Sequence, residues 1–262
     1  MKVLMIGDIV SKPGRDAVAA VVPRLRREEG VELVVANAEN IAGGAGITAS
    51  TAEAIFASGV DVITLGDHTW DKREGEAFVG SHRRVVRPAN YPEGTPGRGW
   101  TMWESASGIR VAVINLCGRV FMPYHYDDPF RAADRVLKEI GQQQAQVVLL
   151  DFHAEATSEK IAIGRYLDGR LGAIVGSHTH IQTADEQILP KGTAYLTDLG
   201  MTGPYDSVLG RKVEDVLKKF LTQMPMRYEV ATDDPKLCGA IIDIDVHNGG
   251  KATAIRRVQM GP

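Results

Sequence analysis

The first 40 residues read MKVLMIGDIVSKPGRDAVAAVVPRLRREEGVELVVANAEN. Two short apolar runs in this stretch, Val3–Ile6 and Leu33–Ala36, are typical of strands that are buried on both faces. Between them, Pro13–Glu29 has the pattern of a helix, and Pro23 predicts that this helix is kinked or divided into two. The stretch therefore has the strand–helix–strand pattern of a parallel sheet that is covered by helices.

The same alternation continues through the first two thirds of the chain. Further predicted strands are Val60–Leu65, Val111–Leu116, Val147–Asp151 and Ala173–Gly176. Further predicted helices are Thr48–Ser58, Pro129–Ile140 and Ser158–Leu167, with Asp128 as an N-cap of the second. Alternating strands and helices predict the α/β class with a largely parallel sheet.

The last third of the chain has a different pattern. Its predicted elements are the strands Ala194–Thr197, Ala240–Val246 and Ala252–Val258 and one helix, Arg211–Leu221. This order favours an antiparallel or second sheet. The Pro- and Gly-rich stretch Arg87–Gly99 is short enough to be a surface loop, so we expect residues 1–262 to form a single domain.

Composition narrows the class of protein and of ligand. Charged residues make up 24% of the chain and hydrophobic residues 44%, as in average soluble globular proteins. A formal charge of -3 leaves no net basic field for non-specific nucleic-acid binding, so we expect no stable nucleic-acid complex. A small nucleotide remains a suitable ligand, and the sequence leaves the oligomeric state open, a homo-oligomer included.

Two features predict a cytoplasmic location. Only Cys117 and Cys238 occur, too few for a disulfide framework, which favours a reducing compartment. The apolar run at the N-terminus meets Asp8 too early for a signal peptide, and no run approaches ~18 uninterrupted apolar residues. We therefore expect a cytoplasmic protein without a membrane-spanning segment.

Polar side chains follow the carboxyl ends of five predicted strands, the edge at which open α/β sheets bind ligands. These segments are Gly7-Asp8, Asn37-Ala38-Glu39-Asn40, Gly66-Asp67-His68, Asp151-Phe152-His153 and Gly176-Ser177-His178-Thr179-His180. Each has an ordinary explanation on its own, such as a helix cap for Asp8 or a turn before Gly43–Gly46 for Glu39 and Asn40. Their combination indicates a metal site.

The histidines make the metal interpretation stronger. His178 and His180 are two residues apart after a strand, so in extended chain both rings would point to one side. Together with His153 and three carboxylates they form an oxygen and nitrogen ligand set that suits Mn, Fe or Zn. Seven candidates exceed the three protein ligands of a typical catalytic zinc and favour two ions, an arrangement that suits phosphoryl transfer.

These motifs, in this order, resemble the calcineurin-like metallophosphoesterases. The strings GDIVSKPGR, NAENIAGGAGIT, GDHTWD and GSHTHIQTADEQILP are similar to the YmdB-like branch, and the likeness covers nearly the whole chain. The resemblance implies a four-layer α/β/β/α sandwich and a di-metal site that often holds iron or manganese. It also implies hydrolysis of cyclic nucleotides, such as 2',3'-cyclic AMP, with 3',5'-cyclic nucleotides as further candidates.

The resemblance assigns a role to each site residue. Asp8, Asn40 and His180 would bind one metal, Asp67, His153 and His178 the other, and Glu39 would bridge them. His68 would be catalytic, because an imidazole can donate a proton to the leaving oxygen or hold a phosphoryl oxygen near neutral pH.

Two positions depart from the superfamily pattern. Val10 stands where a histidine ligand is usual, and Asn40 replaces that ligand as in the YmdB-like branch. Asp67 stands where the third motif usually has Asn, which keeps a ligand but adds a negative charge beside an anionic substrate.

Several interpretations stay open. Asp71 could orient His68 or cap a following helix, and Tyr124 and His125 could stack on a base or belong to an ordinary loop. We expect His82 to lie in a solvated turn and His247 to lie in a hairpin. Alternative functions are a phosphomonoesterase or 5'-nucleotidase, and a non-catalytic nucleotide-binding regulator, although His68 favours an enzyme.

Overall fold

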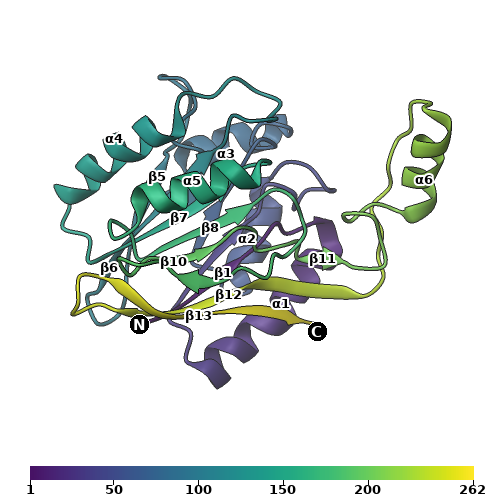
Figure 1. The fold of residues 1–262 in the computed structure, drawn as a ribbon. Coiled ribbons are helices and arrows are strands. Elements are labelled where there is room, and N and C mark those ends of the chain that lie inside the picture. Colours follow the sequence, from purple (N-terminus) through teal and green to yellow (C-terminus); the bar gives the residue numbers. More distant parts are fainter.

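A computed structural model describes all 262 residues as a mixed α/β fold with two sheets and six α-helices (Figure 1). The first sheet contains β1 (Lys2–Ile6), β2 (Leu33–Asn37), β3 (Val62–Thr64), β4 (Val85–Val86), β11 (Gly203–Pro204), β12 (Pro235–Asp245) and β13 (Lys251–Met260). The second contains β5 (Trp100–Glu104), β6 (Arg110–Cys117), β7 (Val147–His153), β8 (Ala173–Ser177), β9 (Gln187–Ile188) and β10 (Ala194–Leu196). The helices are α1 (Ser11–Glu29), α2 (Ala49–Ala57), α3 (Glu76–Ser81), α4 (Pro129–Gly141), α5 (Thr157–Leu167) and α6 (Val213–Thr222).

Strand direction brings the predicted polar ends together. The first sheet has the order β11-β12-β1-β2-β3-β4, with β13 paired to β12, and its strands β1 to β4 are parallel. The second has the order β5-β6-β7-β8-β10-β9, and β6, β7, β8 and β10 are parallel. The carboxyl ends of the parallel strands therefore lie at one edge of each sheet.

The strands of the last third do not form a sheet of their own. β12 pairs antiparallel with β1 and with β13, so it belongs to the first sheet, whereas β10 pairs parallel with β8 in the second. The antiparallel prediction is thus confirmed for the β12–β13 hairpin, whose turn contains His247 as expected. The prediction of a separate second sheet in this region is wrong.

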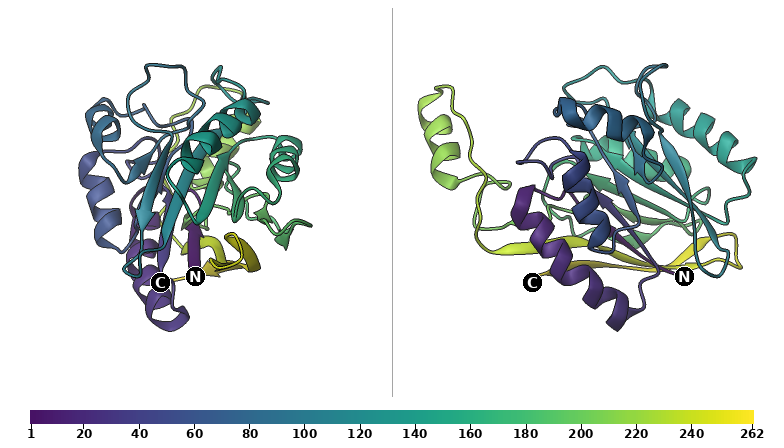
Figure 2. Two further views of the ribbon diagram at one scale, coloured as in Figure 1. Left: turned by 90° about the vertical axis from the view of Figure 1, so that its left-hand side faces the viewer. Right: turned by 180° about the vertical axis from the view of Figure 1, so that it is seen from behind.

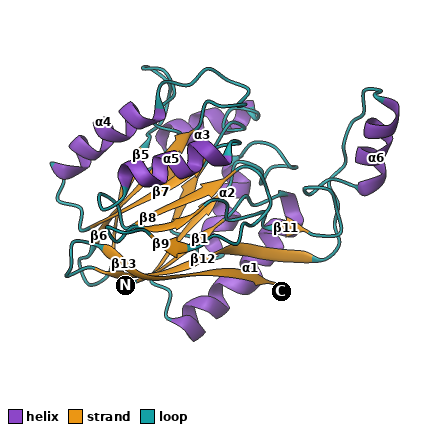
Figure 3. Ribbon diagram, viewed as in Figure 1, coloured by secondary structure: helices purple, strands orange, loops and turns teal.

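Side-chain alternation along the strands fills three cores. Val3 and Met5 point into an apolar core that they share with Val111 and Val113 of the facing sheet. Their neighbours Leu4 and Ile6 point the other way, into a core that includes side chains of α1 and α2. A third core joins the outer face of the second sheet to α4 and α5 (Figures 1, 2 and 3).

Two helices show how local sequence sets their ends. α1 continues through Pro23 from Ser11 to Glu29, so the alternative of two shorter helices is wrong, and Gly30 ends it with a φ of 72°. Asp128 caps α4 as predicted, because its carboxylate accepts hydrogen bonds from the N–H groups of Phe130 and Arg131.

The segment with α6 stands away from the body of the molecule (Figure 1). Its apolar side chains Leu217, Phe220 and Leu221 are more than half exposed. None of the helices combines the length and the apolar character that a membrane span requires.

Candidate metal centre

Four of the seven predicted ligands form one cluster. The ligand atoms of Glu39, Asp67, His153 and His178 all lie within 4.8 Å of one another. Glu39 and Asp67 follow β2 and β3 of the first sheet, His153 is the last residue of β7, and His178 follows β8 of the second. Each sheet therefore contributes two ligands, which meet where the carboxyl ends of the strands of the two sheets lie close together.

His153 lies at the middle of this cluster. Its Nε2 is 2.9 Å from Asp67 Oδ1, 3.1 Å from Glu39 Oε1 and 3.0 Å from His178 Nδ1. His178 Nδ1 is also 3.2 Å from Asp67 Oδ1. Imidazole nitrogens and carboxylate oxygens that converge at such distances are a suitable donor set for a transition metal.

Gly66 leaves the space in which these donors meet. A Cβ at this position would collide with Glu39 Oε2 and with the ring of His153. Any other residue would therefore push the two side chains apart, and glycine is required here by close approach rather than by backbone conformation.

Asp8 provides an independent sign of a cation. Its side chain is completely buried, and its Oδ2 accepts a hydrogen bond of 3.0 Å from the backbone N–H of His178. Its Oδ1 has no hydrogen-bond partner and lies 3.8 Å from His153 Nδ1 and 3.9 Å from His180 Nε2. A buried carboxylate oxygen without a partner is costly, so a bound cation fits this position.

The remaining two predicted ligands lie beside the cluster. Asn40 Nδ2 donates a hydrogen bond of 3.3 Å to Glu39 Oε1. Asn40 and His180 both line a cavity of about 280 Å³ together with Glu39, His68 and His178. All seven predicted ligands are thus brought to the same region.

The prediction that His178 and His180 lie in an extended segment is wrong. His178 and His180 have φ values of 99° and 66°, in the left-handed region, so the chain is not extended there. Both rings still reach the site, but through a strained loop and not through strand alternation.

The charges of the cluster compensate one another. Burial opposes the ionisation of Glu39, but the charge and hydrogen bond of His153, together with the charge of His68, hold the pKa of Glu39 below its ordinary value. Burial also opposes the ionisation of Asp67, yet hydrogen bonds from His153 and His178 lower the pKa of its carboxyl group. Burial alone would lower the pKa of His153, whereas Glu39 and Asp67 raise it well above the usual value. The buried carboxylates thus require positive charge among them, which a metal also supplies.

A buried hydrogen-bond network contacts Nδ1 of His153, the ring nitrogen that faces away from Asp67 and Glu39. Its Nδ1 lies 3.0 Å from Ser177 Oγ, which donates a 2.6 Å hydrogen bond to Asp151 Oδ1. Asp151 Oδ2 accepts further hydrogen bonds from Thr64 Oγ1 at 2.5 Å and from Asn37 Nδ2 at 3.1 Å. Such partners fix the ring of a metal-binding histidine. Sequence reasoning gave these residues no role, although Asp151 lies two residues before His153 and so on the same face of the strand.

A buried ion pair supports the loop of His178 and His180. Lys160 Nζ lies 2.7 Å from Asp198 Oδ2 and donates a 2.9 Å hydrogen bond to the carbonyl of Ser177. Asp198 Oδ2 also accepts hydrogen bonds from the N–H and the hydroxyl of Thr179. Both charged side chains are about 1% exposed. The pair therefore joins α5 to the strained loop, a link that the sequence did not reveal.

Comparison with known proteins decides the family. A model of the family described as YmdB-like protein matches residues 4–258. The chain belongs to the YmdB-like family. The resemblance seen in the sequence motifs is thereby confirmed.

The relatives of this YmdB-like chain match it over nearly its whole length. It is 50% identical over 258 residues to a Bacillus subtilis (strain 168) protein named 2',3'-cyclic-nucleotide 2'-phosphodiesterase, covering 98% of this chain and 96% of that protein. The crystal structure of a hypothetical protein from Thermus thermophilus aligns with a TM-score of 0.92 and 42% identity, covering 100% of this chain and 99% of that one. The crystal structure of a novel phosphatase from Mycoplasma pneumoniae aligns with a TM-score of 0.92 and 31% identity, covering 100% and 93%.

His68 of the YmdB-like chain lies beside the cluster and is 40% exposed. Its backbone N–H donates a 2.8 Å hydrogen bond to Glu39 Oε2, and its Nε2 is 3.9 Å from Asp67 Oδ2. Its Nδ1 lies 2.7 Å from Asp71 Oδ2. Of the two interpretations of Asp71, the structure thus favours orientation of His68, since the next helical turn has no side-chain cap. Burial lowers the pKa of His68, but Glu39, Asp67 and Asp71 together raise it.

Asp67 also lines a cavity with an aromatic wall. This aromatic cavity has a volume of about 310 Å³, and Trp70, Tyr91, Tyr124 and His125 are among the residues that line it. The Gly118–Asp128 loop therefore contributes to the metal-centre region, which favours a binding role for Tyr124 and His125. The prediction that His82 is solvated is wrong, because its ring stacks on Phe56 and Phe78 and its side chain is only 24% exposed.

Proposed function

We propose that this chain is a metal-dependent phosphodiesterase that hydrolyses 2',3'-cyclic nucleotides. The observation that carries the proposal is the convergence of Glu39, Asp67, His153 and His178 at the carboxyl ends of strands from both sheets. The name of the relative that is 50% identical over nearly the full length supports the same substrate class.

We assign two transition-metal ions, iron or manganese, to this centre. The proposed ligands are Asp8, Asn40 and His180 for one ion, Asp67, His153 and His178 for the other, and Glu39 for both. When bound, the ions would supply an activated water and stabilise the charge on the phosphoryl oxygens. The unpartnered Oδ1 of Asp8 and the mixed oxygen and nitrogen donors support this assignment.

His68 is the proposed catalytic acid. Its Nε2 side faces Asp67 while Asp71 holds its Nδ1, so the ring has a fixed orientation beside the cluster. In this position it can donate a proton to the leaving ribose oxygen or hold a phosphoryl oxygen. Asp71, which is not a proposed ligand, lies 2.7 Å from Nδ1, and its hydrogen bond and charge favour the protonated ring that a proton donor requires.

The aromatic cavity is the proposed place of the nucleobase. Trp70, Tyr91 and Tyr124 offer aromatic surface a short distance from Asp67, and bases stack readily on such side chains. A nucleotide can thus place its base there and its cyclic phosphate at the cluster.

The same reasoning extends to the whole chain. We infer that residues 1–262 form one domain with the α/β/β/α four-layer arrangement, since helices pack on both outer sides of the paired sheets. Both cysteines are free and buried, which supports a cytoplasmic location. We expect no stable nucleic-acid complex, and the exposed apolar side chains of α6 are compatible with a homo-oligomer.

The test is a substrate comparison on protein of measured metal content. The manganese- or iron-loaded protein should hydrolyse 2',3'-cyclic AMP faster than 3',5'-cyclic AMP and faster than a nucleoside monophosphate. Preference for the monophosphate would instead support the phosphomonoesterase or 5'-nucleotidase alternative. Binding without turnover of any of the three would support a non-catalytic regulator.

A further inference from the structure

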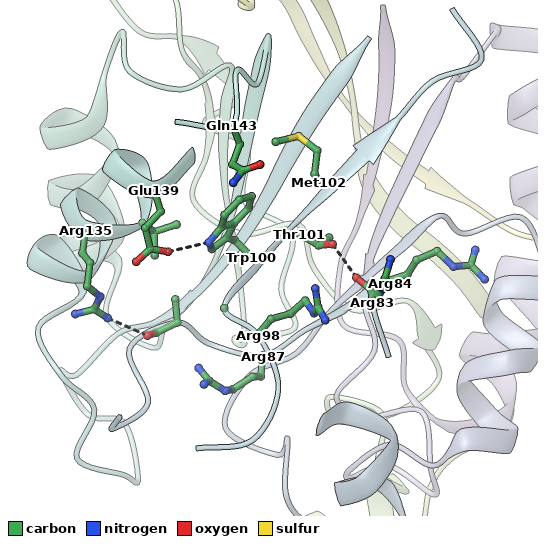
Figure 4. Close-up of a pocket in the computed structure, with 13 residues that line it drawn as sticks. Arg83, Arg84, Arg87, Arg98, Trp100, Thr101, Met102, Arg135, Glu139 and Gln143 are labelled. Carbon is green, nitrogen blue, oxygen red and sulfur yellow. Dashed lines mark hydrogen bonds between the residues drawn. The ribbon is translucent and has the colours of Figure 1, made fainter. Parts of the chain in front are cut away.

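A third cavity, lined by arginines, contains none of the residues assigned to the metal centre. It has a volume of about 730 Å³, larger than either cavity at that centre. Its lining includes Arg83, Arg84, Arg87, Arg98, Arg135 and Trp100, and we call it the arginine cavity (Figure 4). The proposed phosphodiesterase reaction gives this cavity no role.

The fold gathers these residues from three places. Arg83 and Arg84 directly precede β4, Arg98 lies just before β5, and Arg135 is on α4. β4 and β5 are the edge strands at which the two sheets adjoin. Figure 4 shows Arg83 and Arg84 on one side of the cavity, Arg135 and Glu139 on the other, and Trp100 between them.

The positive charge of the cavity is only partly compensated by acidic side chains of the protein. Glu139 is the only acidic residue among its lining residues, although the whole chain has a formal charge of -3. The ion pairs that arginines form with carboxylates in this protein all lie elsewhere. Like charges that gather in one hollow attract an anion, and guanidinium groups match phosphate oxygens in geometry.

The arginines divide into fixed and available ones. Arg87 is buried, and its guanidinium donates hydrogen bonds to the carbonyls of Pro88 and Pro96, so it is part of the wall. Arg83 and Arg98 are exposed, and in each the backbone carbonyl, not the guanidinium, takes part in the hydrogen bonding of the wall. These two side chains are therefore free to bind a ligand.

Trp100 adds an aromatic surface to this charged hollow. Its Nε1–H donates a 3.1 Å hydrogen bond to Glu139 Oε2, which fixes the orientation of the indole. Met102 and Val136 line the cavity as well and give it an apolar part. A ligand that combines phosphate with an aromatic base matches both parts, and the volume is within the ~300–1,000 Å³ typical of small-molecule sites.

We propose that the arginine cavity binds a nucleoside 5'-phosphate, with its phosphates against Arg83 and Arg98 and its base against Trp100. This site is separate from the metal centre and does not depend on the function proposed for that centre.

The direct test is calorimetric titration of the metal-loaded protein with ADP at about 0.15 M salt, where long-range attraction is screened. Arg83→Gln/Arg98→Gln should weaken ADP binding at least tenfold. The control, Arg27→Gln/Lys218→Gln, removes the same charge from exposed positions outside the cavity and should stay within twofold of the wild type. Equal affinities in the two double variants would overturn the proposal.

Two further variants locate the bound nucleotide. His178→Ala should retain ADP binding, and its loss there would place ADP at the metal centre and overturn the proposal. Trp100→Leu should lose the preference for ADP over inorganic phosphate that the wild type shows. A wild type that binds inorganic phosphate as tightly as ADP would contradict the role of Trp100. Binding of a short oligoribonucleotide more than tenfold tighter than ADP would replace the nucleotide by an RNA strand and equally contradict the assignment.

Discussion

Replacement of Asp67 by Asn should raise kcat/KM for a 2',3'-cyclic nucleotide at equal metal occupancy. Asp67 is only 6% exposed, its Oδ1 is 2.9 Å from His153 Nε2, and its Oδ2 is 3.9 Å from His68 Nε2. The substitution therefore removes one negative charge from the place where an anionic phosphate and the proposed proton donor meet. An amide carbonyl can still serve as a ligand, and it leaves the metal a stronger Lewis acid.

The distances set the scale of the effect. Two unit charges about 4 Å apart interact by about 4 kcal/mol at an effective dielectric constant of 20, and by about 1 kcal/mol in water. Neutralisation of Asp67 by a bound metal offsets much of this repulsion, so we expect the lower part of the range. Since about 1.4 kcal/mol corresponds to tenfold in rate, the predicted gain is about tenfold or more.

The assay is steady-state hydrolysis of 2',3'-cyclic AMP by both proteins, with bound metal measured on the same samples. This measurement is needed because an amide holds the metal less tightly than a carboxylate does. Glu155→Gln is a matched control, since Glu155 is half exposed, lies 3.2 Å from His178 Nε2, and is not a proposed ligand. It should change kcat/KM by less than about threefold. Equal or lower activity after Asp67→Asn, at equal occupancy, would refute the reasoning and indicate a centre adapted to the carboxylate.

Four other outcomes are expected. His68→Ala should keep both metals and lose about 10²-fold or more in turnover, and loss of metal would show that His68 is a ligand. Asp71→Asn should lower kcat by about tenfold with KM nearly unchanged, because it loosens the ring of His68, and unchanged kcat would contradict an orienting role. Lys160→Met should lower the free energy of unfolding by about 3–5 kcal/mol in urea titrations, since it leaves Asp198 buried without its partner, and a change under 1 kcal/mol would contradict this. Burial opposes the charge of Asp198, yet Lys160 holds the pKa of this carboxyl below its ordinary value. The ion pair therefore stabilises the fold above the unfolded-state pKa of about 3.9, and this contribution is lost as pH falls through the lower folded pKa. The stability difference between wild type and Asp198→Asn should shrink below about pH 4, and a constant difference would argue against the pair.

The part of the site that follows strand ends could be predicted from sequence. Apolar runs with Asp8, Glu39, Asp67, His153 and His178 just after or at their ends place polar groups at the carboxyl edge of parallel strands, and the structure brings them together there. This inference needs only strand direction and local pattern. It succeeds because each predicted ligand is adjacent in sequence to the strand that positions it.

The supporting contacts could not be predicted in this way. Lys160 meets Asp198, and Ser177 meets Asp151, only because of how elements distant in sequence pack together. The left-handed conformations of His178 and His180 depend on contacts of their loop, which no local pattern encodes.

The arginine cavity has the same kind of origin. Arg83, Arg98 and Arg135 appear in the sequence as separate surface charges, and they face one hollow only because the edges of the two sheets adjoin beside α4.

The most direct test of the metal centre is a crystal structure of the manganese- or iron-loaded protein, with anomalous scattering recorded at the absorption edge of that metal. We predict two anomalous peaks per chain that share Glu39, one beside Asp8 and His180 and the other beside Asp67, His153 and His178. A single peak at full occupancy, or peaks outside this cluster, would contradict the di-metal centre on which the proposed function rests.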